Sequence, residues 1–388
     1  MTNRRLRVGL VAYACHPCEG SEPGAGWQWL SAIAKLHDVD VFTRAGEGKE
    51  LEDAVRAAGL KVEVVRVATP LDSVDRDGVW RYPKYAYWLM KARTVLRNRN
   101  RSHRYDLLHH VTYASDWLPS CIGGLGVPTV WGPVGGSTRT PKELRRYLSR
   151  RANLAEGLRI VVSKVSRSTV ARRTIRNSSL CVALNSDTAR ELGRLGAERI
   201  VVEPNAIVEI SDTPVAARSN DMMTAVYVGR LVEWKGLRIA ILALAHDREF
   251  KWQLHVYGDG KARAAFEALA YDLGVQDRIT FFGRRPRSEV LNALSIADAF
   301  VFPSLHDSAP WAVAEAAASG LPVVCFDLGG GPSLAKSNAC FIDIDDPVHS
   351  IVANLISIAE GERTAQAIDA WDLDKFECRI KRMYEALP

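Results

Sequence analysis

The sequence lacks several features that mark out whole classes of protein. It contains no run of the roughly 18–20 consecutive apolar residues that a membrane-spanning helix needs. No internal repeat and no low-complexity tract is visible. Lysine and arginine only slightly outnumber aspartate and glutamate, 51 against 45, and apolar residues make up 47%. This composition excludes disordered and fibrous classes and is typical of a folded globular protein.

Cysteine is scarce and scattered. The seven thiols are odd in number and do not form the spacing of a disulfide framework. One C-x-x-C turn, Cys15 to Cys18, is compatible with a redox pair or with half of a zinc site. No second closely spaced Cys/His pair accompanies it, so we expect two small buried thiols there.

The amino end resembles a short secretion signal, because Arg4, Arg5 and Arg7 precede the apolar stretch 8–15. The apolar piece is brief, however, and Pro17 and a glycine cluster follow it in place of a polar cleavage region. A buried first strand of a parallel sheet explains the pattern better, and we expect a cytoplasmic chain.

Short apolar runs alternate with amphipathic helical stretches along the whole chain, which is the pattern of a βαβ protein. The expected strands of the first half are 7–13, 39–43, 61–67, 106–111, 128–131 and 180–184. Those of the second half are 224–228, 252–257, 278–282, 298–302, 321–326 and 339–342. A polar, irregular segment, 204–222, separates the halves. We therefore predict two doubly wound α/β domains with a cleft between them.

Glycine-rich turns follow several of these strands, at the edge where such sheets bind ligands. The turns are 20–26, 229–236, 258–260, 283–284 and 329–331. A single turn of this kind is weak evidence, since most glycines merely permit a turn. Five of them in two sheets indicate a ligand that carries phosphates.

Two carboxylates bracket the expected start of a helix. A strand ends near Phe302, and Pro310 is a preferred first-turn residue, so the early amides of the helix form an anion site. Asp307 lies just before this helix, and Glu315 lies about a turn and a half inside it. The two carboxylates could accept hydrogen bonds from hydroxyls at the two ends of an extended polar ligand. On spacing alone, an acid near a helix start and a solvated glutamate are the simpler interpretation.

The Asp307-x7-Glu315 motif, with the following residues 316–324, resembles the signature of retaining GT-B glycosyltransferases, most closely glycosyltransferase family 4. The resemblance covers 205–388 through the further motifs 229–236, 256–260, 281–283, 370–372 and Tyr384. It also takes in 203–205. Over 1–204 it is looser, although 20–27 and 131–136 are similar to a polysaccharide-related branch.

The resemblance implies a GT-B fold, with an acceptor-binding Rossmann-like domain at 1–190 and a donor-binding one at 191–368. The last helix, within 369–388, would cross back to the first domain. Glu315 would hold the ribose of a nucleotide sugar, and Asp307 the transferred sugar. Arg230 and Lys235 would neutralise the diphosphate, with solvation or ordinary ion pairing as the alternative for these cations. Further donor contacts would come from Gly24, Gly229, Gly258, Gly283, Arg284, Ser308, Ala309, Trp311 and Ala312.

The family also places a histidine after the fourth strand, near the transferred sugar. His109 and His110 both lie there, and a gapless match falls on Val111. Side chains alternate along a strand, so only one imidazole would face the cleft. We favour His110 over His109, with a structural histidine as the alternative. Candidates on the acceptor side are Glu22, Gly135 and Gly136.

Three departures from the family pattern bear on the donor more than on the reaction. Asp307 stands where the family usually has glutamate. Pro310 removes one amide from the loop that is usually rich in glycine. Ala25 replaces the second of two paired glycines in the first turn.

The implied reaction moves a hexose, most readily from a UDP- or GDP-linked donor, with retained anomeric configuration. No Asp-x-Asp pair suited to a metal occurs in the core motifs, since the pair at 343–345 lies beyond them. We therefore expect neither a metal nor another cofactor, with Arg230 and Lys235 stabilising the leaving diphosphate. The alternatives are a same-fold nucleotide-sugar epimerase or phosphorylase, a thiol redox protein, and a non-catalytic subunit that binds sugar nucleotides.

Two basic stretches lie in the first domain. Residues 81–104 carry eight lysines and arginines among aromatic residues and no acid, and 139–176 carry twelve against two glutamates. Such stretches suit an anionic membrane surface, which predicts a lipid-linked glycan acceptor at the inner membrane face. The alternatives are solvated basic helices whose apolar stripes pack on the sheet, and a soluble small-molecule acceptor. We expect no nucleic-acid partner, because no recognised motif for one is present.

Overall fold

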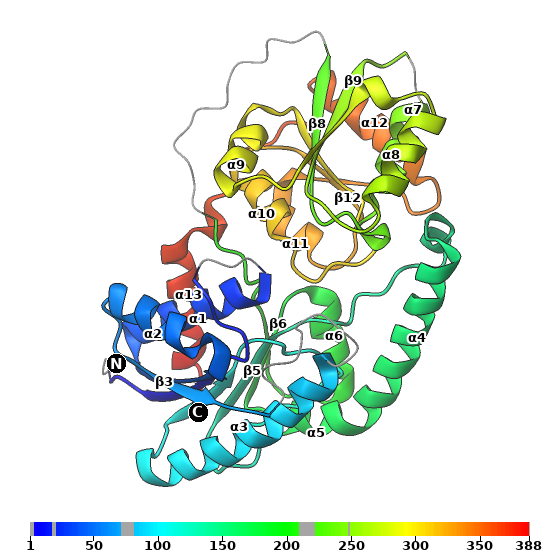
Figure 1. The fold of residues 1–388 in the computed structure, drawn as a ribbon. Helices are drawn as coiled ribbons and strands as arrows, with labels where there is room; N and C mark the ends of the chain where they lie inside the picture. Colours follow the sequence, from blue (N-terminus) through cyan, green and yellow to red (C-terminus); the bar gives the residue numbers. More distant parts are fainter. Residues whose placement is uncertain (1–3, 18–20, 71–80, 209–221, 247–248, 388) are drawn as a thin grey trace. The chain divides into compact units, whose positions relative to one another are not determined.

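The computed structural model describes residues 4–17, 21–70, 81–208, 222–246 and 249–387. These residues form two parallel sheets, each flanked by helices (Figure 1). The chain divides into two compact units. The first comprises Met1–Ser137, Val162–Asn205 and Asp374–Pro388, and the second comprises Thr138–Val161 and Ala206–Leu373. The sequence predicts a boundary near residue 190 and assigns 139–176 to the first domain. The compact units divide after Asn205, and Thr138–Val161 belongs to the second of them.

The first sheet has the strand order β3-β2-β1-β4-β5-β6-β7, and all its strand pairs are parallel. Its strands are β1 (Arg7–Val11), β2 (Asp38–Arg44), β3 (Val62–Val67), β4 (Leu107–His110), β5 (Thr129–Val134), β6 (Leu180–Ala183) and β7 (Ile200–Val202). The first and last residues of six of these strands lie within three residues of the predicted bounds. The seventh, β7, is not predicted by the sequence pattern, because it is only three residues long and two of them are exposed.

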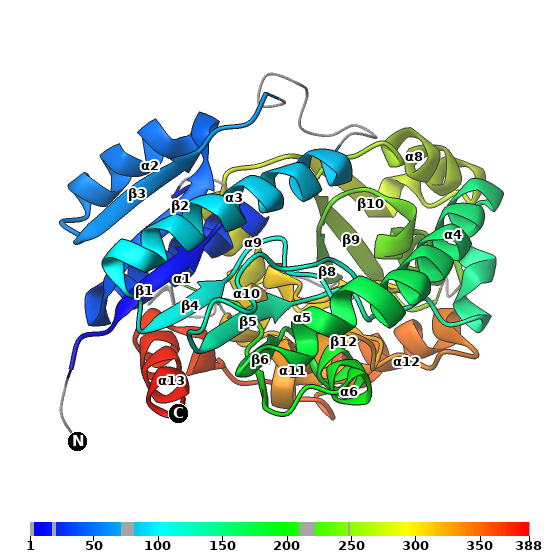
Figure 2. The same cartoon turned by 90° about the horizontal axis from the view of Figure 1, so that it is seen from below.

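Helices cover both faces of the first sheet. They are α1 (Ser21–Leu36), α2 (Ala45–Ala57), α3 (Arg81–His103), α5 (Arg172–Arg176), α6 (Ser186–Leu195) and α13 (Leu373–Glu385). On β4, His110 contacts Tyr85 of α3, and its neighbour His109 contacts Tyr384 of α13. Since neighbouring side chains of a strand point to opposite faces, α3 and α13 lie on opposite sides of the sheet (Figure 2).

The last helix, α13, belongs to the first unit, as the fold class predicts. The Tyr384 hydroxyl lies 2.6 Å from His109 Nδ1. Arg379 forms an ion pair with the buried Glu203 carboxylate, with Nε 2.6 Å from Oε2. These contacts join α13 to the central strand β4 and to the residue that follows the edge strand β7.

The second sheet has the order β10-β9-β8-β11-β12-β13 and is also parallel throughout. Its strands are β8 (Met223–Val228), β9 (Trp252–Tyr257), β10 (Ile279–Gly283), β11 (Ala299–Phe302), β12 (Val323–Cys325) and β13 (Ala339–Phe341). Figure 1 shows one face covered by α7 (Leu237–His246), α8 (Arg263–Asp272) and α12 (Pro347–Ala359). The other face is covered by α9 (Arg287–Ile296), α10 (Trp311–Ala318) and α11 (Gly331–Ala335).

The strand order reverses once in each sheet, between β1 and β4 and between β8 and β11. In doubly wound sheets, ligands bind beyond the carboxyl ends of the strands at this reversal. A further helix, α4 (Arg150–Ser166), contains the point at which the two units divide. No helix in the described part of the chain combines the length and the apolar character needed to cross a bilayer.

Candidate active site

Two loops meet at the strand-order reversal of the second sheet. The loop after β8 contains the short helix η3 (Glu233–Lys235), and the loop after β11 carries Asp307. Lys235 Nζ forms an ion pair with Asp307 Oδ2, and these side chains are only 12% and 17% exposed. The ammonium also lies 5.0 Å from the centroid of the Trp234 ring. The structure thus places two residues predicted to serve the donor in direct contact.

Gly236 explains how the two loops come so close. Its φ is +77°, and a Cβ at this position would collide with the carbonyl oxygen of Pro303. The neighbouring backbone is joined as well, because the Leu305 N–H donates to the Trp234 carbonyl at 2.9 Å. Only glycine combines this backbone conformation with so close an approach.

A cavity of about 590 Å³ opens beyond the ends of β8, β9 and β10. Four of the predicted site residues line it, namely Gly229, Arg230, Gly258 and Arg284. Its other lining residues are Val228, Tyr257, Asp259, Gly260, Arg285 and Val290. The predicted Gly283 lies beside it, since its carbonyl accepts a hydrogen bond from the Gly258 N–H at 2.8 Å.

Glu315 lies on α10 and is buried, with 9% of the residue exposed. Arg287, at the start of α9, donates from Nε to Glu315 Oε1 at 2.9 Å. Burial raises the pKa of the Glu315 carboxyl, and Arg287 opposes that rise. The solvated glutamate suggested by spacing alone is therefore wrong. The pairing arginine is a site residue that the sequence analysis missed.

The glycine-rich turn 329–331 packs against the loop that precedes α10. Gly330 N–H donates to the Asp307 carbonyl at 2.9 Å. Gly329 has a φ of +64°, and a Cβ there would collide with the same carbonyl oxygen. This turn therefore holds the Asp307 loop in place. The predicted residues Ser308, Ala309, Trp311 and Ala312 are half-buried along this loop and the first turn of α10.

His306, which was not predicted, precedes Asp307. Its ring stacks on Trp234 at 4.6 Å, and its Nδ1 lies 2.9 Å from the Thr140 hydroxyl. Burial lowers the pKa of His306 to about 4, so the ring is neutral near pH 7. A second cavity, of about 1030 Å³, has His306 in its wall together with Arg151, Arg230, Arg238 and Lys261 among its lining residues. The only sequence signal for His306 is its place at the end of a strand.

The remaining predicted site residues belong to the first unit. His109 is fully buried and hydrogen-bonded at both ring nitrogens, with Nε2 donating to the Gly132 carbonyl at 2.8 Å and Nδ1 accepting from Tyr384. Burial lowers the pKa of His109 to about 3. This imidazole is therefore neutral and links the sheet to α13.

His110 is also fully buried, with Nδ1 2.7 Å from the Ser120 hydroxyl and Nε2 3.0 Å from the Thr112 carbonyl. Burial lowers the pKa of His110 to about 4. Val111, the alternative match, is buried as well. Both imidazoles thus have the burial and hydrogen bonds of the structural alternative. That one of them, His110 in preference to His109, faces the cleft stays a prediction.

Glu22 and Gly24 lie at the start of α1. The Glu22 carboxylate accepts a hydrogen bond from the Tyr113 N–H at 3.0 Å and so holds the loop after β4. Gly24 is buried in the first turn of the helix itself. The two residues thus lie beside the strand-order reversal of the first sheet.

Gly135 and Gly136 are held by a buried ion pair. Arg167 Nε lies 2.6 Å from Asp116 Oδ2, and both side chains are at most 3% exposed. The Asp116 N–H donates to the Gly135 carbonyl at 3.0 Å, and Arg167 donates to the Gly136 carbonyl at 3.1 Å. The two glycines of the motif 131–136 therefore lie in a loop after β5 that hydrogen bonds from Asp116 and Arg167 hold in place.

Comparison with known proteins gives the same fold and identifies the family. Residues 211–370 match the family described as glycosyl transferases group 1, and residues 24–206 match the glycosyl transferase 4-like domain. The D-inositol 3-phosphate glycosyltransferase of Corynebacterium glutamicum is 35% identical over 358 residues, which span 84% of this chain and 82% of that protein. The chain belongs to the glycosyl transferases group 1 family.

Solved structures show the GT-B fold. The lipopolysaccharide outer core galactosyltransferase WaaB aligns with 97% of this chain and all of its own, at a TM-score of 0.63 and 14% identity. Anabaena HepE, solved with UDP-glucose, aligns with 99% of this chain and all of its own, at 0.59 and 17%. The family match and this fold together make the protein an enzyme, a GT-B glycosyltransferase.

In this glycosyltransferase, Cys15 is fully buried and burial raises the pKa of its thiol. A thiolate is the reactive form in redox exchange, so the environment of Cys15 disfavours that chemistry. Cys18, the other half of the C-x-x-C turn, lies outside the described residues.

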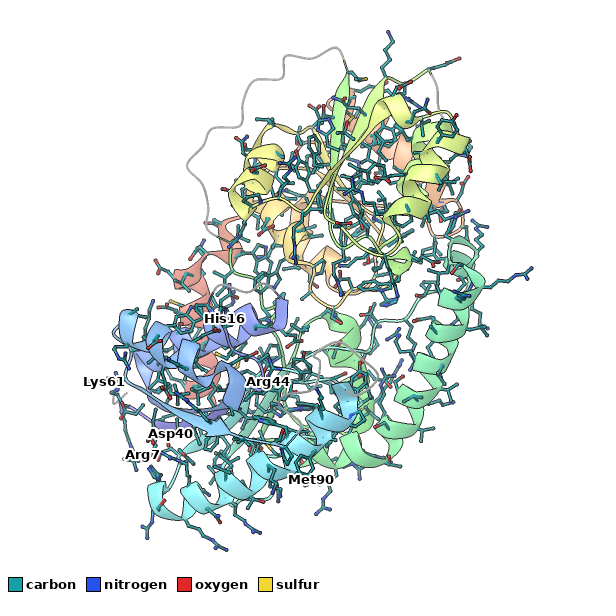
Figure 3. The ribbon with its side chains drawn as sticks, in the orientation of Figure 1. Arg7, His16, Asp40, Arg44, Lys61 and Met90 are labelled. Carbon is teal, nitrogen blue, oxygen red and sulfur yellow. The ribbon has the colours of Figure 1, made fainter. Side chains whose placement is uncertain are left out.

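Among the described residues, one group of side chains is close enough to hold a metal ion, and it lies in the first unit of the glycosyltransferase. It consists of Asp40, labelled in Figure 3, with Glu63 and His103. Arg99 already lies between the two carboxylates, 3.2 Å from Asp40 and 2.5 Å from Glu63. The guanidinium lies between the carboxylates and offsets one of their two negative charges, so the three side chains form an ion-pair network.

We predict that Gly236→Ala disrupts nucleotide binding by this glycosyltransferase and lowers its stability. The matched control is Gly274→Ala, because Gly274 has a similar φ of +69° but open space around the new Cβ. The control should cost about 1–2 kcal/mol from the backbone alone, whereas Gly236→Ala should cost more and displace Lys235. Urea unfolding and nucleotide titration measure both effects, and equal results for the two variants would contradict the close approach.

Proposed function

We propose that this glycosyltransferase transfers a hexose from a UDP- or GDP-linked donor with retention of anomeric configuration. The observation that carries the proposal is the clustering of charge at the ends of the second sheet. Arg230 and Arg284 line one cavity, and the Lys235–Asp307 ion pair lies at the neighbouring strand-order reversal. Glu315 pairs with Arg287, two residues after Arg285 in the cavity wall.

Each group has a role in this proposal. Arg230 and Lys235 bind the diphosphate, together with the amides at the start of α10. Glu315 accepts hydrogen bonds from the ribose hydroxyls, and Asp307 accepts them from the transferred sugar. Arg287 acts as a positioning residue, because it holds the Glu315 carboxylate in place before the donor arrives.

In the proposed reaction, the acceptor oxygen forms a bond to the anomeric carbon on the face from which the nucleotide leaves. The bond between that carbon and the diphosphate oxygen breaks, and its electron pair goes to the leaving group. A phosphate oxygen takes the proton of the acceptor hydroxyl. Lys235 and Arg230 stabilise the negative charge that develops, as fixed charges in a site poor in water do.

The reaction as proposed needs no metal ion. The two cations occupy the role that a divalent ion has in other transferases, and they carry their charge without any bound ion. The histidines of β4 receive no reacting role, since both are fully buried and hydrogen-bonded at both ring nitrogens.

For the acceptor, we propose a lipid-linked glycan met at an anionic membrane surface. Exposed basic residues in 139–176 support this choice, among them Arg150, Arg151 and Lys164. A soluble phosphorylated acceptor is the second candidate, because the relative from C. glutamicum is named for D-inositol 3-phosphate. Product formation with each class of acceptor separates the two.

We predict that Lys235→Met lowers kcat about 100- to 1,000-fold, as loss of one charge-stabilising group does. Glu315→Gln should weaken donor affinity about 10- to 100-fold, since it removes a charged hydrogen-bond acceptor. Thermal shifts with UDP and GDP sugars, together with turnover assays, measure these effects. The true donor at 100 times its Kd should stabilise the wild type by about 2.7 kcal/mol.

Controls for these variants are Lys251→Met and Glu267→Gln, which change exposed residues of the same types in the same unit. Both should behave as wild type. Full activity of Lys235→Met and Glu315→Gln, or a panel of nucleotide sugars without any shift, would contradict the proposed donor site.

We also predict that the product keeps the donor's anomeric configuration and that excess chelator leaves turnover unchanged. Proton NMR of the product reports the first, and an assay in EDTA with or without manganese reports the second. An inverted product, or activity that chelator removes and manganese restores, would contradict the mechanism. Epimer formation from donor alone, or a requirement for inorganic phosphate, would favour the epimerase or phosphorylase alternative.

A further inference from the structure

Helix α4 presents an exposed row of large apolar side chains. This row, the α4 stripe, consists of Leu154, Leu158, Val161, Val162 and Val165. Their exposed fractions are 75%, 66%, 59%, 48% and 62%. The spacings of four, seven, eight and eleven residues from Leu154 place all five on one side of the helix. The exposed apolar residues therefore form a continuous strip.

The α4 stripe differs from the other exposed apolar residues in the described part of the chain. Elsewhere, large exposed apolar side chains occur singly, as at Met90, Tyr271 and Ile296, or as the pair Val201 and Val202 on β7. Single exposures are normal on soluble proteins and need no explanation. A contiguous apolar strip on a surface usually marks a place where something binds.

The opposite side of α4 is occupied by polar contacts, which fix the orientation of the helix. Glu156 is buried, accepts from the Thr140 N–H at 3.3 Å and pairs with Arg159 at 2.8 Å. Ser163 is buried on the same side. The α4 stripe is therefore the outer face of a helix whose inner side is already packed.

Charge around the α4 stripe has a single sign. Exposed cations lie along α4 and the start of α5, at Arg150, Arg151, Lys164, Arg172 and Arg173. None of the five forms an ion pair with another described residue. The segment 150–176 contains one acid, and that acid is the buried Glu156. Two copies of this surface would repel each other if they met face to face.

We infer that the α4 stripe and its cations dock on an anionic lipid bilayer, with the helix lying in the plane of the membrane surface. Apolar side chains of such a helix enter the boundary between headgroups and acyl chains, while long cations reach back to the lipid phosphates. Each cation near an anionic surface adds to the attraction. The inference deepens the membrane proposal made above for the acceptor and rests on it, because it names the helix face that binds the bilayer; vesicle binding is measured without donor or acceptor, so it is tested apart from the transfer reaction.

The other basic stretch predicted for the membrane lacks this arrangement. The apolar face of α3 is buried in the first unit through Tyr85, Trp88 and Leu89. Met90, labelled in Figure 3, is an isolated exposed residue of this helix. Helix α3 thus fits the alternative from the sequence, a solvated basic helix packed on the sheet, and it supplies matched controls.

Co-sedimentation of the protein with vesicles tests the inference. We expect binding to vesicles of phosphatidylcholine with phosphatidylglycerol and little binding to phosphatidylcholine alone, and added salt should weaken it. Leu154→Gln combined with Leu158→Gln should weaken binding about tenfold or more, because two exposed leucines no longer enter the lipid. The control, Met90→Gln combined with Ile296→Gln, changes apolar residues that are 62% and 61% exposed and should bind as wild type.

A second pair of variants tests the charge. Arg150→Gln combined with Lys164→Gln should weaken binding to the anionic vesicles, whereas Lys91→Gln combined with Arg97→Gln on α3 should not. All the changed side chains are exposed, so melting temperatures should stay at the wild-type value, which shows that the variants fold.

Three results would overturn the inference. The first is equal binding of the wild type to both kinds of vesicle, or to neither. The second is unchanged binding after the change at Leu154 and Leu158. The third is a dimer in sedimentation velocity that the same change abolishes, which would assign the α4 stripe to a second copy of the chain.

Discussion

The ion pair between Lys235 and Asp307 is the interaction on which the site of the second unit depends. It joins the loops after β8 and β11, which flank the strand-order reversal of the second sheet. Gly236 and Gly330 allow the backbones of these loops to touch neighbouring segments, so the charged pair has little freedom to move. Charges fixed before the substrate binds need no rearrangement during the reaction, which is the basis of electrostatic catalysis.

The two units share one sheet topology but differ in the side chains at the ends of their strands. In the second unit, ionised side chains lie at the ends of the strands beside open cavities, as Arg230 and Arg284 do. In the first unit, the two histidines of β4 beside the corresponding reversal are buried and neutral, and they join the sheet to α13 and α3. The donor chemistry proposed here therefore uses the charged residues of the second unit.

Much of the fold could be predicted because buried parallel strands are continuous apolar runs. The strand β7 was not predicted, because three residues at the edge of a sheet are too few to form a recognisable apolar run. The positions of Asp307 and Glu315 follow from their motif, but Arg287 does not, since its pairing depends on how α9 packs beside α10. His306 was missed for a similar reason, as its contacts with Trp234 and Thr140 come from distant parts of the chain.

The exposed faces of α3 and α4 could not be predicted from the sequence either. A basic, amphipathic stretch can bury its apolar side or expose it, and only packing decides between the two. Helix α3 buries Trp88 and its neighbours, whereas α4 exposes Leu154 and Leu158. In α4 the side that faces inward carries the buried Glu156, and no local pattern reveals this orientation.

Hydrogen–deuterium exchange with and without a saturating nucleotide-sugar donor tests the central claim most directly. If the donor binds at the ends of the second sheet, amide exchange should slow in the segments 229–236, 258–260 and 303–316. Protection confined to the first unit, or none at donor concentrations that support turnover, would contradict the account.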